Sequence, residues 1–218
     1  MKYTTAVFDL DGTLLDTTRD LALAVNHALA AFGMPTRPEK DIISFTGNGI
    51  VRLMELSVPE GTPDDLYEQV FAEFKRYYGD HALDHTEPYD GVPALIADLH
   101  AAGLKTAVVS NKADFAVQQI IDARMPGAFD AVLGECEAAG IRKKPAPDMV
   151  DAVLERLAAD RSSLVYIGDS EVDVATAAAC GCPCVNVSWG FRTREELVAA
   201  GATTIVDTPD ELRRVLLG

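Results

Sequence analysis

Residues 4–14 read TTAVFDLDGTL, and this stretch decides how the remainder of the chain is interpreted. Thr4–Phe8 is a short run of β-branched and apolar residues, which predicts a buried strand. Two aspartates, Asp9 and Asp11, and a glycine, Gly12, follow this run directly. Acidic side chains at the carboxyl end of a buried strand are typical of a ligand-binding site in an open α/β fold.

Alternating strand and helix patterns fill most of the remaining chain. Further strands are expected at Lys105–Val109, Phe129–Leu133, Leu164–Ile167, Cys184–Val187 and Thr204–Val206. Helical patterns lie between them at Val92–Ala102, Ala113–Ala123, Pro147–Ala158, Asp173–Ala179, Arg194–Ala200 and Pro209–Leu216. This alternation predicts the α/β class, with a parallel sheet that is covered by helices on both faces.

The segment between Leu15 and about Asp84 breaks this alternation, because it contains helical patterns and no convincing strand. The helical patterns lie at Thr18–Phe32, Lys40–Phe45, Ile50–Leu56 and Asp64–Tyr78. We therefore expect residues 16–84 to form a helical cap domain, inserted into a core domain made of residues 1–15 and 85–218. An insertion after the first strand would lie above the carboxyl end of that strand, where a lid belongs.

The chain carries a large negative charge. Its 218 residues include 34 acidic and 19 basic residues, which gives a formal net charge of −15. A nucleic-acid backbone or an anionic membrane surface requires a surplus of Lys and Arg, so neither is an expected partner. No apolar stretch reaches the roughly 18–20 residues of a membrane span, and the first residues lack the layout of a signal peptide. We therefore expect a cytoplasmic protein.

Three of the cysteines, Cys180, Cys182 and Cys184, form a C-x-C-x-C run. A metal site is one interpretation of such a run. Structural zinc sites usually use C-x-x-C pairs and four ligands, however, whereas these cysteines lie among small residues at the start of an expected strand. We therefore interpret the run as part of the buried core.

Polar side chains follow three of the expected strands. Asp9 and Asp11 follow the first, Ser110 and Asn111 follow the second, and Asp169 follows the fourth. The carboxyl ends of parallel strands share one edge of the sheet, so these side chains should converge. Neighbouring carboxylates repel each other unless a cation offsets their charge. Oxygen ligands favour Mg²⁺, since zinc would require His or Cys at these positions.

The two aspartates of the first strand end suit different steps of phosphoryl transfer. Asp9, ionised and bound to the metal, is the expected nucleophile. Asp11 can donate a proton to the leaving alcohol and then accept one from the attacking water. The expected reaction therefore passes through an aspartyl phosphate.

The oxygens of the transferring phosphoryl group need donors and a positive charge. Ser110 and Asn111 supply donors, and so do the backbone N–H groups of residues 10–12. Lys144 follows the third strand and precedes a helix, which makes it the best-placed cation. Lys143 is its nearest competitor.

These residues resemble the motifs of the haloacid dehalogenase-like hydrolase superfamily. Its four motifs are matched in order by residues 9–14 (DLDGTL), Ser110-Asn111, Lys144-Pro145 and residues 168–173 (GDSEVD). The resemblance implies a Rossmann-like core and a helical cap inserted after the first motif. It also implies Mg²⁺ held by Asp9, the Asp11 carbonyl and Asp169, with Asp173 in support. Gly12 and Thr13 of the first motif are candidate substrate-binding residues.

Within the superfamily, the chain is most similar to phosphoglycolate phosphatases. The similar segments are residues 46–49 (TGNG), Lys112 after the second motif, residues 88–92 (PYDGV) and residues 188–191 (SWGF). Gly47, Asn48 and Gly49 are candidates for a cap loop that contacts the substrate. Trp189 is expected to pack beside the site. The implied substrate is 2-phosphoglycolate, one of the small phosphorylated metabolites that such an enzyme would take.

Other functions of the same or a related fold remain open from the sequence. A phosphomutase of the β-phosphoglucomutase type would return the phosphoryl group to a sugar. A pyrophosphatase or sugar-phosphate phosphatase would share the core motifs. A signalling receiver domain also phosphorylates an aspartate, but the helical insertion and Asp11 argue against it. The sequence leaves open whether the protein is a monomer or a homodimer.

Overall fold

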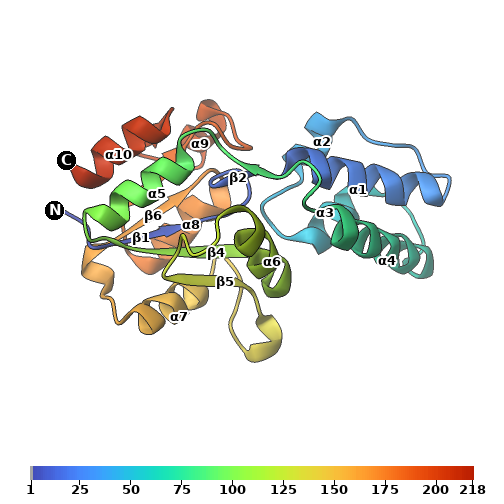
Figure 1. Ribbon diagram of the computed structural model, residues 1–218. Coiled ribbons are helices and arrows are strands. Elements are labelled where there is room, and N and C mark those ends of the chain that lie inside the picture. The colour runs from blue at the N-terminus through green and yellow to red at the C-terminus, as the bar shows by residue number, and fades with distance from the viewer. Residues whose placement is uncertain (1) are drawn as a thin grey trace. The chain divides into compact units, whose positions relative to one another are not determined.

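The computed structural model describes residues 2–218 (Figure 1). The chain divides into two compact units. The first is a core made of the residues up to Leu15 together with Pro88–Gly218, and the second is a helical unit made of Asp16–Glu87. Among the described residues, no helix combines the length and the apolar character that a membrane crossing would require.

A six-stranded sheet forms the centre of the core, in the order β5-β4-β1-β6-β7-β8. All neighbouring strands run parallel. The strands are β1 Thr5–Phe8, β4 Lys105–Ala113, β5 Ala131–Glu135, β6 Leu164–Gly168, β7 Cys184–Val187 and β8 Ile205–Val206. The predicted α/β class and its parallel, Rossmann-like sheet are confirmed. The chain proceeds outward in one direction from β1 through β4 to β5 and in the other from β6 to β8, so the order reverses beside β1. Ligands bind at such a reversal in open α/β sheets.

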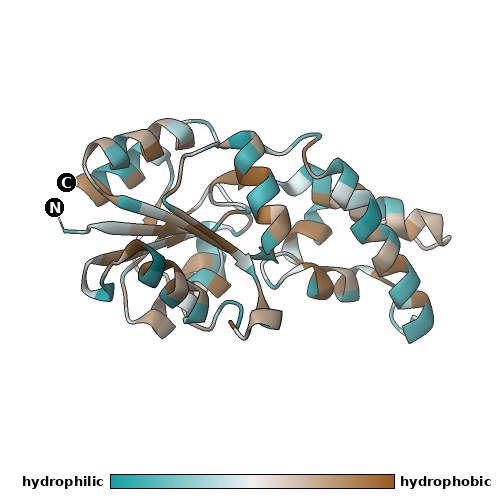
Figure 2. Ribbon diagram, turned by 60° about the horizontal axis from the view of Figure 1, so that its bottom comes forward, coloured by the Kyte–Doolittle hydropathy of each residue, from teal (hydrophilic) through white to brown (hydrophobic). Residues whose placement is uncertain are grey.

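Helices cover both faces of the sheet, with α5 and α10 on one face and α7 on the other (Figure 1). The core helices are α5 Val92–Ala101, α6 Asp114–Arg124, α7 Asp148–Leu157, α8 Glu171–Cys180, α9 Arg194–Ala199 and α10 Pro209–Leu217, with short 3-10 turns at Glu137–Ala139 and Arg161–Ser163. Side chains of β1, β4, β5 and β6 pack on those of α7 and α8 in one buried cluster. Figure 2 shows the matching hydrophobic colour along the central strands. Burial on both faces explains why these strands are continuously apolar.

Two strands, β4 and β5, have bounds that differ from the prediction by two or more residues. Strand β4 continues to Ala113 rather than ending at Val109, and its register against β5 shifts between these two residues. The intervening side chains are polar but buried, so the hydropathy pattern placed the end of the strand too early. Strand β5 covers Ala131–Glu135 rather than Phe129–Leu133. Phe129 precedes the strand, and its ring packs edge-on against Phe8 with centroids 6.4 Å apart.

The helical unit is built from four helices, as the sequence predicts for this segment. They are α1 Thr18–Ala31, α2 Glu39–Ser44, α3 Ile50–Ser57 and α4 Asp64–His81. Their apolar faces form a separate buried cluster. Helix α4 continues past its predicted end at Tyr78, and the rings of Tyr77 and His81 stack with centroids 4.1 Å apart in this last turn. Where the chain passes between the two units, the short strands β2 (Leu15–Asp16) and β3 (Glu87–Pro88) pair with each other.

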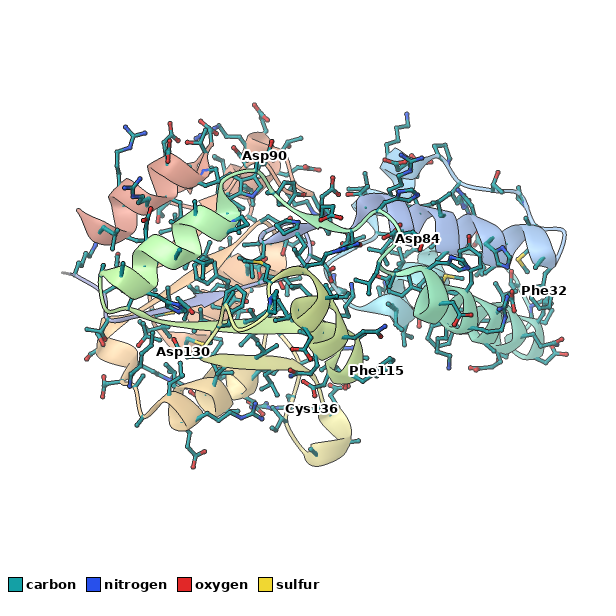
Figure 3. All side chains as sticks on the ribbon, viewed as in Figure 1. Phe32, Asp84, Asp90, Phe115, Asp130 and Cys136 are labelled. Atoms are coloured by element: carbon teal, nitrogen blue, oxygen red, sulfur yellow. The ribbon has the colours of Figure 1, made fainter. Side chains whose placement is uncertain are left out.

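Most large apolar side chains are buried, but Phe115 is an exception. It lies in the first turn of α6 and is 73% exposed (Figure 3). A single exposed apolar side chain is ordinary on a protein surface, so it needs no functional explanation.

Candidate active site

Asp9 lies directly after the central strand, at the point where the order of the sheet reverses. The Asp9 N–H donates to the Ile167 carbonyl at 2.9 Å, so the pairing of β1 with β6 extends to this residue. Asp9 is 7% exposed. Its Oδ1 accepts the Leu10 N–H at 2.7 Å and pairs with Lys144 Nζ at 2.8 Å. Both contacts use Oδ1, so no described residue engages Oδ2 of Asp9.

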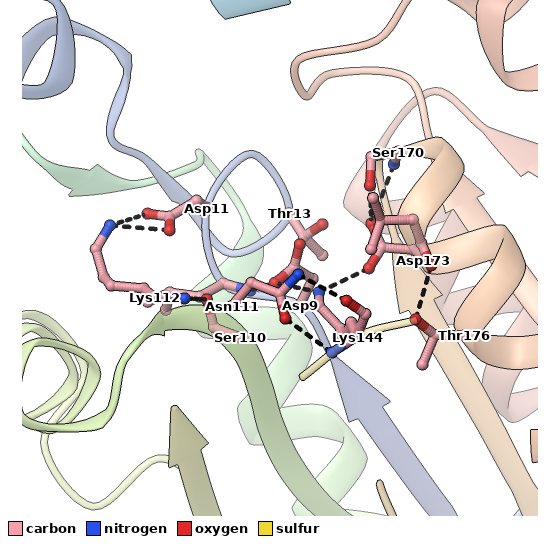
Figure 4. Close-up of polar contacts among 12 residues, drawn as sticks. Asp9, Asp11, Thr13, Ser110, Asn111, Lys112, Lys144, Ser170, Asp173 and Thr176 are labelled. Carbon is pink, nitrogen blue, oxygen red and sulfur yellow. Dashed lines mark hydrogen bonds and ion pairs between the residues drawn. The ribbon is translucent and has the colours of Figure 1, made fainter. Parts of the chain in front are cut away.

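Two more aspartates, Asp169 and Asp173, follow the neighbouring strand β6, and Figure 4 shows Asp173 near Lys144. Asp169 is 1% exposed, and Asp173 in the first turn of α8 is fully buried. Lys144 Nζ, 2.8 Å from Asp9, also donates to Asp173 Oδ1 at 2.9 Å, so this lysine links the two strand ends. Ligand oxygens of Asp9, Asp169 and Asp173 all lie within 4.8 Å of one another. The sequence left Lys143 and Lys144 open, and Lys144 is the lysine that reaches Asp9.

The electrostatics of this cluster show an excess of negative charge. Burial raises the pKa of Asp9 to about 7, although Lys144 opposes the rise. Burial, together with the charges of Asp173 and Asp9, also raises the pKa of Asp169 well above its ordinary value. Burial lowers the pKa of Lys144, but the charges of Asp173 and Asp9 outweigh this effect and raise it overall. One lysine thus pairs with two of the three buried carboxylates, Asp9 and Asp173, and a bound cation would stabilise this excess of negative charge.

The donor set fits a hard divalent cation. The cluster offers carboxylate oxygens, which are the ligands that Mg²⁺ prefers. Both oxygens of Asp173 already have hydrogen-bond donors. Its Oδ2 accepts the Ser170 hydroxyl at 2.6 Å, and its Oδ1 accepts the Tyr166 hydroxyl at 3.1 Å and the Lys144 ammonium group. Asp9 and Asp169 are therefore the better candidates for direct ligands, with Asp173 behind them.

Asp11 points away from this cluster and is held by a lysine that the sequence analysis did not include in the site. Lys112 Nζ donates to both carboxylate oxygens of Asp11, at 2.7 and 2.8 Å (Figure 4). The Lys112 side chain is 4% exposed. A buried lysine that pairs with both oxygens fixes the direction of the carboxylate. The available signal was the place of Lys112, immediately after Ser110 and Asn111 at the strand end.

Ser110 and Asn111 lie at the end of β4, as predicted, and both are buried. The Ser110 hydroxyl accepts the Lys112 N–H at 3.2 Å. The Asn111 amide bonds to both backbone groups of Lys144: its Oδ1 accepts the N–H at 2.9 Å, and its Nδ2 donates to the carbonyl at 3.1 Å. Asn111 therefore holds the segment that carries Lys144. Contact of either side chain with a phosphate stays a prediction.

Gly12 and Thr13 lie against Asp169. The Thr13 hydroxyl donates to Asp169 Oδ1 at 2.9 Å. Gly12 has a φ of +84°, and a Cβ at this position would come within 2.4 Å of Asp169 Oδ2. Only glycine adopts this backbone conformation readily and permits such a close approach. The two residues thus join the loop after β1 to the acidic residue after β6.

Two other candidate groups lie elsewhere in the chain. Gly47, Asn48 and Gly49 connect α2 and α3 in the helical unit, with φ values of +106° at Gly47 and +84° at Gly49. Their contact with a substrate stays a prediction. Among the described residues, the acidic cluster around Asp9 is the one group of three or more His, Cys, Asp or Glu side chains with metal-binding spacing, so the C-x-C-x-C run is not such a group.

Acidic side chains and a buried lysine, gathered where the order of a parallel sheet reverses, are typical of α/β enzymes. A family model for haloacid dehalogenase-like hydrolases matches residues 6–187, and the chain belongs to this family. It is therefore a hydrolase of the haloacid dehalogenase-like type.

The chain is also similar to individual proteins that carry more specific names. The chain is 33% identical to a phosphoglycolate phosphatase of Neisseria meningitidis, with 84% of this chain and 80% of that protein covered. A protein of Lactobacillus delbrueckii subsp. bulgaricus, provisionally named a phosphoglycolate phosphatase, has a crystal structure with a TM-score of 0.94 at 39% identity over the whole of both chains. A CbbY mutant of Rhodobacter sphaeroides, crystallised with xylulose-1,5-bisphosphate, has a TM-score of 0.74 at 25% identity, with 96% of each chain covered.

Proposed function

We propose that this protein is a Mg²⁺-dependent phosphatase that hydrolyses a small phosphate monoester, with 2-phosphoglycolate as its substrate. The proposal rests on the contacts of the Asp9 carboxylate. One carboxylate oxygen is fixed by Leu10 and Lys144, and Oδ2 is left for attack on phosphorus. The substrate assignment rests on relatives that carry the name phosphoglycolate phosphatase.

In the first half-reaction, Oδ2 of Asp9 forms a bond to phosphorus while the bond from phosphorus to the ester oxygen breaks. Asp11 donates a proton to the departing oxygen, which leaves as an alcohol. In the second half-reaction, water attacks the phosphorus of the aspartyl phosphate and Asp11 accepts a proton from it. Inorganic phosphate leaves, and the carboxylate of Asp9 is restored.

Asp9, Asp169 and the backbone carbonyl of Asp11 would hold the Mg²⁺, with Asp173 in support. When bound, the ion offsets the negative charge that the carboxylates and the phosphoryl oxygens bring together. Lys144 stays paired between Asp9 and Asp173, so it keeps Asp9 oriented and adds a positive charge beside the phosphoryl group. Ser110 and Asn111 are the proposed donors to that group.

Lys112 has a separate role in this mechanism. It holds the ionised form of Asp11, the form that accepts the proton in the second half-reaction, by both oxygens and so fixes the place of this group relative to the strand end. Proton transfer requires a donor or acceptor within hydrogen-bond reach of the reacting atom, which makes this placement important.

The helical unit is the proposed cap, and its loop Gly47–Gly49 is the proposed contact with the part of the substrate beyond the phosphate. The unit is inserted into the chain just after the residues of the first motif. Binding of small metabolites, and not of nucleic acid, agrees with the net charge of −15.

A phosphate-release assay tests this function. The panel includes 2-phosphoglycolate, a sugar bisphosphate, a sugar monophosphate and pyrophosphate, each with Mg²⁺ and with EDTA. We expect release of phosphate from 2-phosphoglycolate, its loss with EDTA, and its loss in Asp9→Asn. Asp122→Asn, an exposed change in α6, is the matched control. If the protein prefers the sugar bisphosphate, the substrate is a compound like the one crystallised with the CbbY mutant and not 2-phosphoglycolate. If a sugar phosphate is isomerised without release of phosphate, the protein is a mutase.

A further inference from the structure

The loop of residues 188–192, which follows β7, makes a set of contacts that the proposed reaction leaves unexplained. It holds the single tryptophan of the chain, Trp189. The Trp189 indole N–H donates to the Thr13 carbonyl at 3.1 Å, in the loop after β1. The Phe191 backbone N–H donates to Asp169 Oδ2 at 2.7 Å. One short loop therefore contacts both of the strand ends that carry the candidate metal ligands.

The backbone of Gly190, between these two residues, lies so close to Asp169 and Gly12 that a side chain would not fit. A Cβ at this position would meet the Gly12 carbonyl oxygen at 2.3 Å, Asp169 Cβ at 2.4 Å and Asp169 Oδ2 at 2.5 Å. Two of these are a backbone atom and a Cβ, which no side-chain rotation can move away. The loop backbone thus packs directly on Asp169 and on the turn after β1.

The far end of the loop is also fixed. Arg192 is 9% exposed, and its guanidinium donates to both carboxylate oxygens of Glu171, at 2.8 and 3.1 Å. Glu171 begins α8 and is two residues from Asp169. A guanidinium that binds a carboxylate through two hydrogen bonds constrains direction as well as distance. The loop is therefore anchored to the helix that follows Asp169 as well as to Asp169 itself.

The two oxygens of Asp169 are oriented by different partners. Oδ1 accepts the Thr13 hydroxyl at 2.9 Å, and Oδ2 accepts the Phe191 N–H. Thr13 is itself tied to the loop through Trp189. We infer that residues 189–191 are positioning residues, which set the orientation of Asp169 and thereby the affinity of the site for its divalent cation.

This inference rests on the proposed function, because it takes Asp169 as a metal ligand. Groups that orient a ligand typically change metal affinity by about 10–100-fold when they are lost. The backbone N–H of Phe191 permits a clean test. Phe191→Pro removes the donor, and Phe191→Ala keeps it while removing the ring.

The measurement is binding of Mn²⁺, another cation that takes oxygen ligands, followed by the EPR signal of the free ion with no substrate present. We expect Phe191→Pro and Gly190→Ala each to weaken Mn²⁺ binding by about 10–100-fold. Phe191→Ala should keep most of the affinity. Gly79→Ala in α4 is a second control. A Cβ at Gly79 meets nothing within 4 Å, so this variant should bind Mn²⁺ as the wild type does.

The outcomes separate this inference from the proposed function. If Asp169→Asn loses Mn²⁺ while Phe191→Pro and Gly190→Ala bind it as the wild type does, the loop has no positioning role and the metal site stands. If the wild type binds no Mn²⁺, the proposed metal-dependent function fails, and the inference fails with it. If Phe191→Pro does not fold, Trp189→Phe decides, since it keeps an aromatic ring and removes the N–H that bonds to Thr13. Weaker Mn²⁺ binding supports the positioning role, and unchanged binding overturns it.

Discussion

At the scale of single residues, the pairing of Lys112 with Asp11 has the most direct consequence for the rate. Lys112→Met removes the group that holds both oxygens of Asp11. We expect kcat for 2-phosphoglycolate to fall by roughly 10–100-fold, a part of the effect of a complete general acid–base. Steady-state kinetics measure this, and Lys112→Arg should recover part of the loss because it keeps the charge.

The leaving group provides the control for this prediction. An ester with a good leaving group needs little protonation, so 4-nitrophenyl phosphate should lose much less activity in Lys112→Met than 2-phosphoglycolate does. Lys105→Met is the matched variant, since Lys105 lies on the same strand at its other end, where it bonds to the Leu157 carbonyl. Equal losses for both esters would show that Lys112 supports the structure rather than Asp11.

At the scale of elements, Gly134 in β5 permits a close crossing of two segments. A Cβ there would meet Asp114 Cα at 2.4 Å, and Asp114 N and Lys112 O at 2.7 Å each. All three are backbone atoms, so the clash requires backbone movement. We expect Gly134→Ala to lower the free energy of unfolding by about 1–3 kcal/mol. Urea unfolding followed by Trp189 fluorescence measures this, because Trp189 belongs to the core.

Gly79 is the comparison for this change. It lies within α4, and a Cβ at Gly79 meets nothing within 4 Å. Gly79→Ala should leave the midpoint of the Trp189 transition in place, and it should raise the stability of its helix by up to about 1 kcal/mol. If Gly134→Ala is as stable as the wild type, β5 and α6 can move apart without a loss of stability.

The strand ends could be predicted from the sequence for a physical reason. Buried parallel strands are continuous apolar runs, so the residues that interrupt them, such as Asp9 and Asp169, are visible as polar breaks. Lys112 could not be placed in the same way, because the pattern was read as ending at Val109 and its partner Asp11 is distant in sequence. The Phe191 N–H escapes sequence analysis altogether, since a backbone donor carries no residue signature.

At the scale of the whole molecule, the net charge of −15 opposes the approach of an anionic substrate. Salt screens this repulsion, since the Debye length falls from about 30 Å at 0.01 M to about 8 Å at 0.15 M ionic strength. We therefore expect kcat/KM for 2-phosphoglycolate to rise by a few-fold over this range at constant free Mg²⁺, with kcat nearly unchanged. A fall of kcat/KM with added salt would instead show that the local positive charge of the site governs association.

Because β2 pairs with β3, the helical unit is a segment that could be replaced by another. The chain leaves the core at Leu15 and re-enters it at Pro88, and these two points belong to strands that are bonded to each other. Ends that already meet can be joined by a short turn at little entropic expense. Evolution, or a protein engineer, can therefore exchange the whole inserted segment for another while the strand that precedes Asp9 keeps its neighbours.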